Sequence, residues 1–292
     1  MTRYRLDIAY DGTGFSGWSR QPSLRTVQGT LEDAVFAVFG RRGRGIQLTV
    51  AGRTDAGVHA TGQVAHLDLE PERVARLERA QTRPGRQALP AAQALLRRVN
   101  GVLGLYPDVL ITAVTEAPAG FDARFSAVWR RYRYRLADAV SGRDPLTRHT
   151  TAWHPHPLDE ALMDAAARSL VGLHDFAAYC RPREGATTIR TLLDYRWRRD
   201  DDGVLIADVK ADAFCHSMVR ALVGACVAVG EGKLAPDDLP RLRDALERTS
   251  AFTVMPARGL TLVQVGYPED DLLAARAELT RARRTLASGD DE

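Results

Sequence analysis

The chain has 292 residues, of which 45% are hydrophobic and 26% charged, and its formal net charge is +3 at pH 7. This length and composition are typical of a globular protein with one large domain or two modest ones. No apolar run approaches the roughly 18 residues of a membrane span, and the N-terminal residues begin a strand pattern instead of a secretion signal. We therefore expect a cytoplasmic protein without a membrane segment.

Strand and helix patterns alternate through the first half of the chain in the order β-α-β-β-α-β. Residues 3–10 alternate between apolar and charged side chains, as in a half-buried strand. A helical stripe follows between Thr26 and Gly40, which are typical N-terminal and C-terminal caps. The other elements expected here are strands at 46–51, 63–69 and 108–115, helices at 72–80 and 90–99, and a loop insertion at 83–90.

The second half repeats this order. Its expected elements are strands at 125–137, 188–199, 204–213 and 260–267, helices at 158–171 and 216–230, and an additional helix at 236–248. The repeat predicts an α+β fold of two RRM-like or ferredoxin-like halves, residues 1–116 and 117–268. Each half would have an antiparallel sheet with one open face, a surface suited to RNA. Residues 269–292 would add a peripheral helix, expected at 270–286, and an acidic tail.

The cysteines and histidines do not have the spacing of a disulfide framework or a metal site. Cys180, Cys215 and Cys226 are an odd number without a CxxC spacing, so we expect buried free thiols. His59 and His66 lack a third ligand at a usual spacing. The sequence therefore predicts no metal ion, and these histidines are expected in the core or in solvent.

A glycine pattern follows the first expected strand, in the segment DGTGFSG. Gly12, Gly14 and Gly17 match the GxGxxG fingerprint of dinucleotide-binding folds. That fold needs a helix opening within the pattern and an acidic residue ending a second strand, whereas the residues that follow here have the composition of a loop. We favour a glycine-rich loop, and the adjacent Trp18 and Arg20 indicate that it faces a partner.

Asp55 is the strongest candidate for a reactive group. It lies in the segment AGRTDAGVHA, between Gly52 and Gly57, in a connection between two expected strands. Glycines let a ligand approach the backbone closely, and loops held by strands often carry reactive side chains. A loop aspartate is more often a turn former. In an extended segment, however, Arg53 shares a face with Asp55, and its guanidinium would keep the carboxylate ionised for covalent attack.

The densest basic feature is the segment VWRRYRYRL. Alternation places Tyr132, Tyr134 and Leu136 on one strand face and the arginines at 131, 133 and 135 on the other. Interleaved arginine and aromatic residues are typical of nucleic-acid surfaces, but a solvated strand face with core tyrosines fits the pattern equally well. Arg220, on the apolar helix expected at 216–230, either extends to solvent or points into a site.

Several collinear segments carry a resemblance to one enzyme family. They are YDGTGFSGW at 10–18, TVQGTLE at 26–32, AGRTDAGVHATGQVAH at 51–66, FDARFSAVWRRYRYRL at 121–136, HDFAAY at 174–179, FCHSMVRALVG at 214–224 and GLTLVQVGY at 259–267. Together they resemble the TruA family, tRNA pseudouridine synthase I, over about residues 3–267. The match in GRTDAGVHA is highly specific.

The resemblance implies the pseudouridine synthase fold, with two halves joined around a central cleft. It implies that Asp55 is the nucleophile, that Tyr132 contacts the target uridine and that Leu262 lines the base pocket. Arg53 and Arg220 would support the carboxylate and the substrate. The implied reaction isomerises uridine to pseudouridine at about positions 38 to 40 in the anticodon arm of tRNA. The resemblance also implies a homodimer that works without a cofactor.

Two other interpretations stay open. A non-catalytic RNA-binding protein of paired RRM-like units would leave Asp55 without a role, and the sequence lacks the aromatic RNP1 pattern of RRM proteins. A synthase that modifies a different uridine would use the same chemistry, because a resemblance fixes a reaction better than its target.

Overall fold

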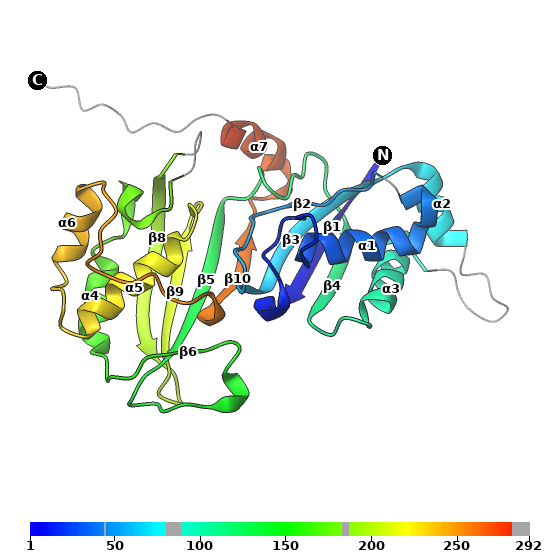
Figure 1. The fold of residues 1–292 in the computed structure, drawn as a ribbon. Coiled ribbons are helices and arrows are strands. Elements are labelled where there is room, and N and C mark those ends of the chain that lie inside the picture. The colour runs from blue at the N-terminus through cyan, green and yellow to red at the C-terminus, as the bar shows by residue number, and fades with distance from the viewer. Residues whose placement is uncertain (44, 80–88, 183–186, 282–292) are drawn as a thin grey trace, which may run out of the picture. The chain divides into compact units, whose positions relative to one another are not determined.

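The computed structural model describes residues 1–43, 45–79, 89–182 and 187–281. The chain is a mixed α+β protein, as expected, and its contacts group it into two compact units (Figure 1). Unit 1 consists of residues 1–127 and 262–280, and unit 2 consists of residues 128–261 and, of the described residues, Arg281. None of the helices within the described ranges is long and apolar enough to cross a membrane.

Unit 1 contains an antiparallel sheet in which β1 pairs with β3 and β4, and β2 pairs with β3. Its strands are β1 at Thr2–Tyr10, β2 at Thr49–Val50, β3 at His59–Leu69 and β4 at Val109–Glu116, and β10 at Leu260–Gly266 neighbours β3. β1 thus lies between β3 and β4, which is the arrangement expected of a β-α-β-β-α-β unit. β3 begins earlier than the expected start at residue 63, so the loop that carries Asp55 leads directly into a strand.

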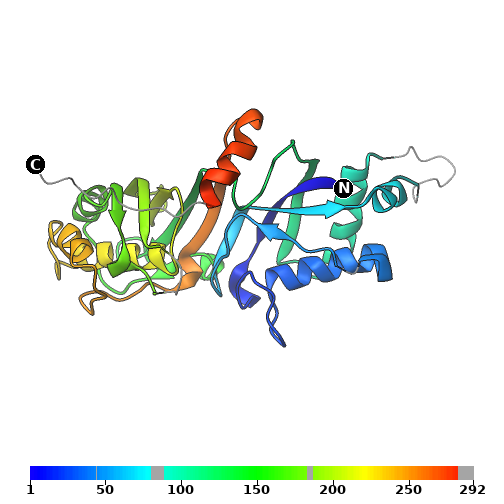
Figure 2. The same ribbon diagram turned by 90° about the horizontal axis from the view of Figure 1, so that it is seen from above.

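Helices cover one face of this sheet, where α1 and α3 lie side by side and α2 packs against α3 (Figures 1 and 2). Their bounds are Val27–Phe39 for α1, Pro71–Arg79 for α2 and Ala91–Leu103 for α3. Both expected caps of α1 are confirmed, since Thr26 Oγ1 accepts the Gly29 N–H at 3.2 Å and Gly40 has a φ of 61°. Of the loop insertion expected at 83–90, residues 83–88 lie outside the described residues.

The segment that precedes β5 packs with unit 1. Tyr267 Oη donates to the Ala123 carbonyl at 2.7 Å, and Ser126 Oγ donates to the Leu273 carbonyl at 3.0 Å. Residues 117–127, which the sequence pattern assigned to the second half, are thereby grouped with the first unit. The last described helix is α7, Leu273–Arg281, and the rest of the C-terminal helix expected to reach residue 286 lies outside the described residues.

Unit 2 contains a sheet in the order β5-β9-β8-β7, with β6 paired to β5. Its strands are β5 at Trp129–Ala137, β6 at Ala152–Trp153, β7 at Gly172–Asp175, β8 at Ile189–Arg199 and β9 at Leu205–Ala211. The expectation of a purely antiparallel sheet is wrong here, because β6 runs parallel to β5, with Leu136 opposite Ala152. Strands as short as β6 and β7 contain too few residues to show a periodic pattern.

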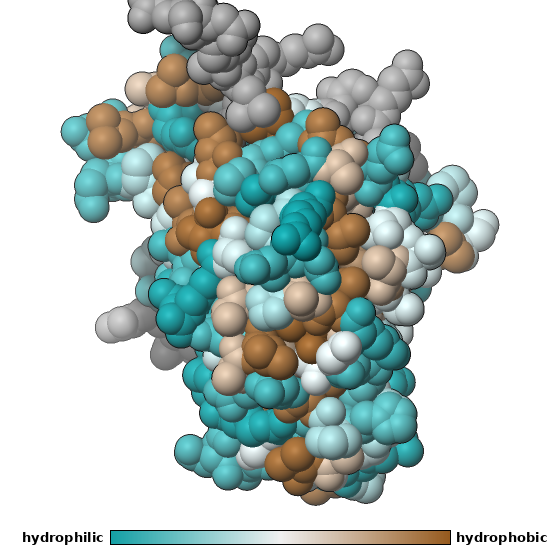
Figure 3. Space-filling view, turned by 90° about the vertical axis from the view of Figure 1, so that its left-hand side faces the viewer, coloured by the Kyte–Doolittle hydropathy of each residue, from teal (hydrophilic) through white to brown (hydrophobic). Residues whose placement is uncertain are grey.

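The helices α4 at Glu160–Arg168 and α5 at Met218–Gly230 pack side by side on one face of the unit 2 sheet (Figures 1 and 2). The additional helix expected at 236–248 is present as α6, Asp238–Asp244. α5 lies so close to the segment before β10 that a Cβ on Gly224 would be 2.0 Å from the Thr253 carbonyl oxygen. On the side of unit 2 seen in Figure 3, hydrophobic and hydrophilic residues are interspersed.

Candidate active site

The loop that carries Asp55 is a tight turn at the start of β3. The Val58 N–H donates to the Asp55 carbonyl at 3.2 Å and closes this turn. Within it, Gly57 has a φ of 77°, a left-handed conformation that glycine adopts without strain. Asp55 itself is half-buried in unit 1. The turn therefore fixes the main chain immediately after the candidate nucleophile.

The glycine-rich segment after β1 holds the same loop from the other side. The Trp18 N–H donates to the Thr54 carbonyl at 3.0 Å, and the Gly57 N–H donates to the Phe15 carbonyl at 3.3 Å. A Cβ on Gly12 would lie 2.1 Å from the Val58 carbonyl oxygen, so only glycine fits there. The GxGxxG spacing thus reflects packing against a loop of the same chain, within an antiparallel sheet, and the dinucleotide interpretation is excluded.

Trp18 and Arg20, which lie beside the glycine segment, contact other residues of unit 1. Trp18 is 1% exposed and packs beside the Tyr10 ring, with 6.1 Å between the ring centroids. Arg20 forms ion pairs with Glu32 and Asp33 at 3.0 and 2.7 Å. The Trp18 ring therefore belongs to the core and does not support the expectation that this loop faces a partner.

The two histidines of this region are core residues, one of the two outcomes expected for them. His59 is 3% exposed and its Nδ1 accepts the Gly12 N–H at 3.0 Å, while His66 Nδ1 accepts the Ala123 N–H at 3.0 Å. Burial lowers the pKa of His66 below its ordinary value. Across the described ranges, no three side chains from His, Cys, Asp and Glu are grouped to hold a metal ion.

Arg53 lies two residues before Asp55 and is exposed. It forms no ion pair with another residue in the described part of the chain, so the Arg53–Asp55 pair suggested by strand alternation is not formed. Residues 56 and 57 of this loop form a turn, and residues 51–58 contain no strand.

The alternation expected in β5 is confirmed in unit 2. Tyr132, Tyr134 and Leu136 are buried, with 8%, 0% and 0% of their surfaces exposed. The Tyr132 ring meets the Phe214 ring edge to face, at 5.1 Å between centroids and 89° between planes. This contact fixes the Tyr132 ring against the segment that leads into α5.

Arg220 is half-buried on α5, and its side chain is hydrogen-bonded to the segment before β10. Its Nε donates to the Met255 carbonyl at 2.6 Å, and the Met255 N–H donates to the Arg220 carbonyl at 3.1 Å. These two bonds tie α5 to the segment before β10. Leu262, on β10, is fully buried. Asp55, Arg53 and Leu262 thus belong to unit 1, whereas Tyr132 and Arg220 belong to unit 2.

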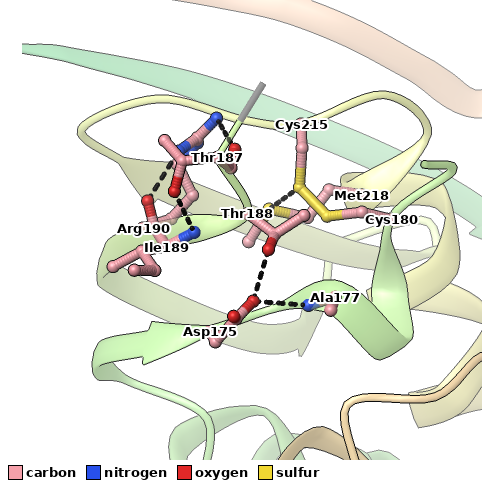
Figure 4. The surroundings of a disulfide bond; sticks show 9 residues. All are labelled: Asp175, Ala177, Cys180, Thr187, Thr188, Ile189, Arg190, Cys215 and Met218. Atoms are coloured by element: carbon pink, nitrogen blue, oxygen red, sulfur yellow. Dashed lines mark hydrogen bonds between the residues drawn. A yellow bond between two sulfur atoms is a disulfide. The ribbon is translucent and has the colours of Figure 1, made fainter. Parts of the chain in front are cut away.

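A disulfide joins Cys180 and Cys215 at the start of the segment that leads to Arg220 (Figure 4). The expectation of free thiols is wrong for this pair, and it is confirmed for the buried Cys226. The cysteines are 35 residues apart in sequence, but the β7-β8-β9 pairing brings their Cα atoms to 5.8 Å. Figure 4 also shows Met218, whose Sδ lies 3.6 Å from the Cys215 sulfur. The disulfide therefore anchors the N-terminal end of α5.

A basic groove of about 230 Å³ lies across β5, β9 and β8. We define it by its charged side chains, which are Arg131, Arg133, Arg196, Arg198, Lys210, Asp194 and Asp208. Asp208 pairs with Arg133 and Asp194 pairs with Arg196. The other three cations form no ion pair with a described residue, and Lys210 Nζ lies 4.2 Å from the centroid of the Trp129 ring. Because side chains alternate along a strand, the basic groove lies on the opposite face of the sheet from Tyr132.

Comparison with known proteins identifies the family. A sequence profile described as tRNA pseudouridine synthase matches residues 8–97 and 166–268, which include the Asp55 loop and α5. The chain belongs to the tRNA pseudouridine synthase family. The expectation from the sequence segments is thereby confirmed, and with it the enzyme class, an isomerase.

Curated relatives of this family match nearly the whole chain. The protein named tRNA pseudouridine synthase A from Leifsonia xyli is 67% identical over 98% of this chain and 98% of its own length. Proteins of the same name from Frankia casuarinae and Streptomyces avermitilis are 55% and 52% identical, over 97% and 98% of this chain and 96% and 95% of their own lengths. A solved dye-decolorizing protein from V. cholerae is 9% identical, with a TM-score of 0.21 over 94% of this chain and 95% of that one. A score this low does not indicate a shared fold.

Proposed function

We propose that this synthase isomerises uridine to pseudouridine in the anticodon arm of tRNA, at about positions 38 to 40. Relatives named tRNA pseudouridine synthase A, which match 98% of the chain, support the tRNA substrate. The observation that carries the proposal is the Asp55 loop, which a closed turn and the glycine-rich segment hold on both sides. Such a loop presents one carboxylate on a rigid support.

Asp55 acts as the covalent nucleophile in this proposal. The carboxylate forms a covalent bond to the nucleotide, and the N1–C1′ bond of the uridine breaks. The base then turns, a C5–C1′ bond forms, and the bond to Asp55 breaks, which regenerates the carboxylate. C5 then gives up its proton to solvent, and N1 ends with a proton, so the product is an isomer of the substrate. A carboxylate is sufficient as the covalent partner, and the reaction neither oxidises nor reduces the base. We therefore propose a reaction without a metal ion or a cofactor.

The other candidate residues bind the flipped nucleotide. Extruding a base from its stack costs a few kcal/mol, which contacts in the site have to offset. Tyr132 contacts the uridine, and its phenol is positioned to move a proton. Arg53 and Arg220 support the carboxylate and the substrate, and Leu262 lines the base pocket. The Met255 carbonyl, which accepts from Arg220 Nε, supports this role because it fixes the direction of that side chain.

The basic groove binds the phosphate backbone of the same tRNA. Three of its cations form no ion pair with a described residue, and together with the adjacent Trp129 they are suited to phosphates and exposed bases. The groove and Tyr132 lie on opposite faces of the unit 2 sheet. The backbone it contacts is therefore not that of the nucleotide at Tyr132.

The remaining expectations stand as parts of this proposal. We propose the pseudouridine synthase fold, in which two halves border a central cleft, and a homodimer in the cytoplasm, where tRNA is available. The functional halves would be residues 1–116 and 117–268, with residues 269–292 peripheral. Family membership supports the fold, and the ferredoxin-like strand order of unit 1 agrees with it.

The test is the release of tritium from tRNA labelled at uridine C5. The proposal predicts release with wild-type protein and no added metal ion or cofactor, and it predicts pseudouridine at positions in the anticodon arm. Absence of release from a complete tRNA pool would contradict the reaction. Release accompanied by pseudouridine elsewhere in the tRNA would contradict the target.

A further inference from the structure

A chain of buried polar groups lies directly behind the Asp55 loop. Tyr10 Oη and Thr54 Oγ1 are 2.8 Å apart, and Gln63 Nε2 donates to Tyr10 Oη at 3.2 Å and to the Gly52 carbonyl at 2.9 Å. Tyr10, Thr54 and Gln63 are 5%, 6% and 0% exposed. The three side chains come from the end of β1, from the loop and from β3, so the network connects the loop to two paired strands.

The orientation of each group in this network is fixed by the structure around it. Gln63 Oε1 accepts the Val64 N–H at 3.2 Å, which leaves its amide nitrogen directed at Tyr10 and Gly52. Burial raises the pKa of Tyr10 to about 12, although its bonds to Thr54 and Gln63 oppose that shift. The phenol is therefore neutral at pH 7 and remains both donor and acceptor.

The network acts on the main chain immediately before Asp55. Gly52 is held at its carbonyl by Gln63, and Thr54 is held at its side chain by Tyr10 and at its carbonyl by the Trp18 N–H. A buried polar group that loses its partner costs about 1 to 3 kcal/mol, so the loop cannot shift without breaking these bonds together. The turn after Asp55 needs a separate anchor, which the Gly57–Phe15 bond provides.

We propose that Tyr10, Thr54 and Gln63 are positioning residues, which fix the backbone on the N-terminal side of Asp55 and thereby set where its carboxylate meets the uridine. The inference rests on the proposed function of Asp55. It assigns a catalytic consequence to three buried side chains that act through the backbone of the loop. Misplacing a reacting group by about 1 Å can cost a factor of about 100 in rate.

The test compares Thr54→Val, which keeps the shape of the side chain and removes the hydroxyl, with Thr54→Ser, which keeps the hydroxyl. We expect Thr54→Val and Tyr10→Phe each to lower kcat for tritium release about tenfold or more, with the Kd for tRNA unchanged. Thr54→Ser should stay within about twofold of wild type. Because Thr54→Val and Tyr10→Phe break the same hydrogen bond, the variant with both changes should lose little more kcat than the worse of the two single variants.

Tyr4→Phe is the matched control, because Tyr4 lies on the same strand and the same face as Tyr10, is 2% exposed and is outside the network. It should keep the wild-type kcat. The inference is overturned if Thr54→Val keeps the wild-type kcat, if Thr54→Ser loses as much as Thr54→Val, or if the losses appear in the Kd for tRNA instead. An inactive wild-type protein would instead contradict the proposed function, so the two failures are distinguishable.

Discussion

Replacing Gly17 with alanine tests whether the glycine-rich segment controls the Asp55 loop. Gly17 has a φ of 89°, and a Cβ there would lie 3.1 Å from the Thr54 carbonyl oxygen and 3.3 Å from the Ala56 nitrogen. The left-handed backbone alone costs a non-glycine residue of the order of 1 to 3 kcal/mol. The contact adds a displacement of the loop by a few tenths of an ångström. We therefore expect a less stable protein whose catalytic carboxylate is also misplaced.

Gly40→Ala separates these two effects. Gly40 also has a positive φ, 61°, but a Cβ there would meet no atom within 4 Å. Both variants should lose stability in urea unfolding, because alanine rarely adopts a positive φ. Only Gly17→Ala should lose kcat, by about fivefold to tenfold in tritium release at saturating tRNA. Equal kcat in the two variants would refute the idea that this segment positions the loop.

Three further predictions concern unit 2. Cys180→Ser removes the disulfide to Cys215, which spans 35 residues, and should lower the free energy of unfolding by about 3 to 4 kcal/mol. A reducing agent should have the same effect on the wild-type protein. Equal stability of variant and wild type would contradict a structural role for the disulfide. Burial opposes ionisation of Asp138, but Arg199 and backbone N–H groups outweigh it and lower the pKa of Asp138. Asp138→Asn should therefore lower the free energy of unfolding by about 3 kcal/mol at pH 7. The difference between wild type and variant should shrink as the pH falls from about 4 through the lowered pKa of Asp138. A difference in urea unfolding that stays constant with pH would contradict this prediction. Arg131→Ala should weaken tRNA binding at the basic groove severalfold and reduce the salt slope of log Kd by about 1, with kcat at saturation unchanged; an unchanged Kd would remove the groove from the tRNA-binding surface.

The predictable part of the fold is the part with a periodic sequence. β1 and β5 alternate clearly, and α1 has a cap residue at each end, so their positions follow from local rules. β6 has two residues and β7 has four, which is too short for any period to appear. The Cys180–Cys215 bond depends on strand pairing across 35 residues, and spacing rules for disulfides do not capture that.

The candidate site was only partly predictable for a similar reason. Asp55 can be singled out because glycines flank it in a loop between strands. The network behind it cannot, since Thr54 and Gln63 are ordinary polar residues in the sequence, and only the pairing of β1 with β3 brings Tyr10 to them. One signal is visible in the sequence: Gln63 precedes an apolar stretch, and a polar residue buried at such a position needs hydrogen-bond partners.

The most direct test of the central claim is Asp55→Asn, which replaces the nucleophilic oxygen and keeps the size of the side chain. Tritium release from C5-labelled tRNA should fall by at least about a thousandfold, while the Kd for tRNA stays within about twofold of wild type. Loss of release with intact binding is the result that covalent catalysis by Asp55 predicts. Release by the variant at the wild-type rate would contradict it.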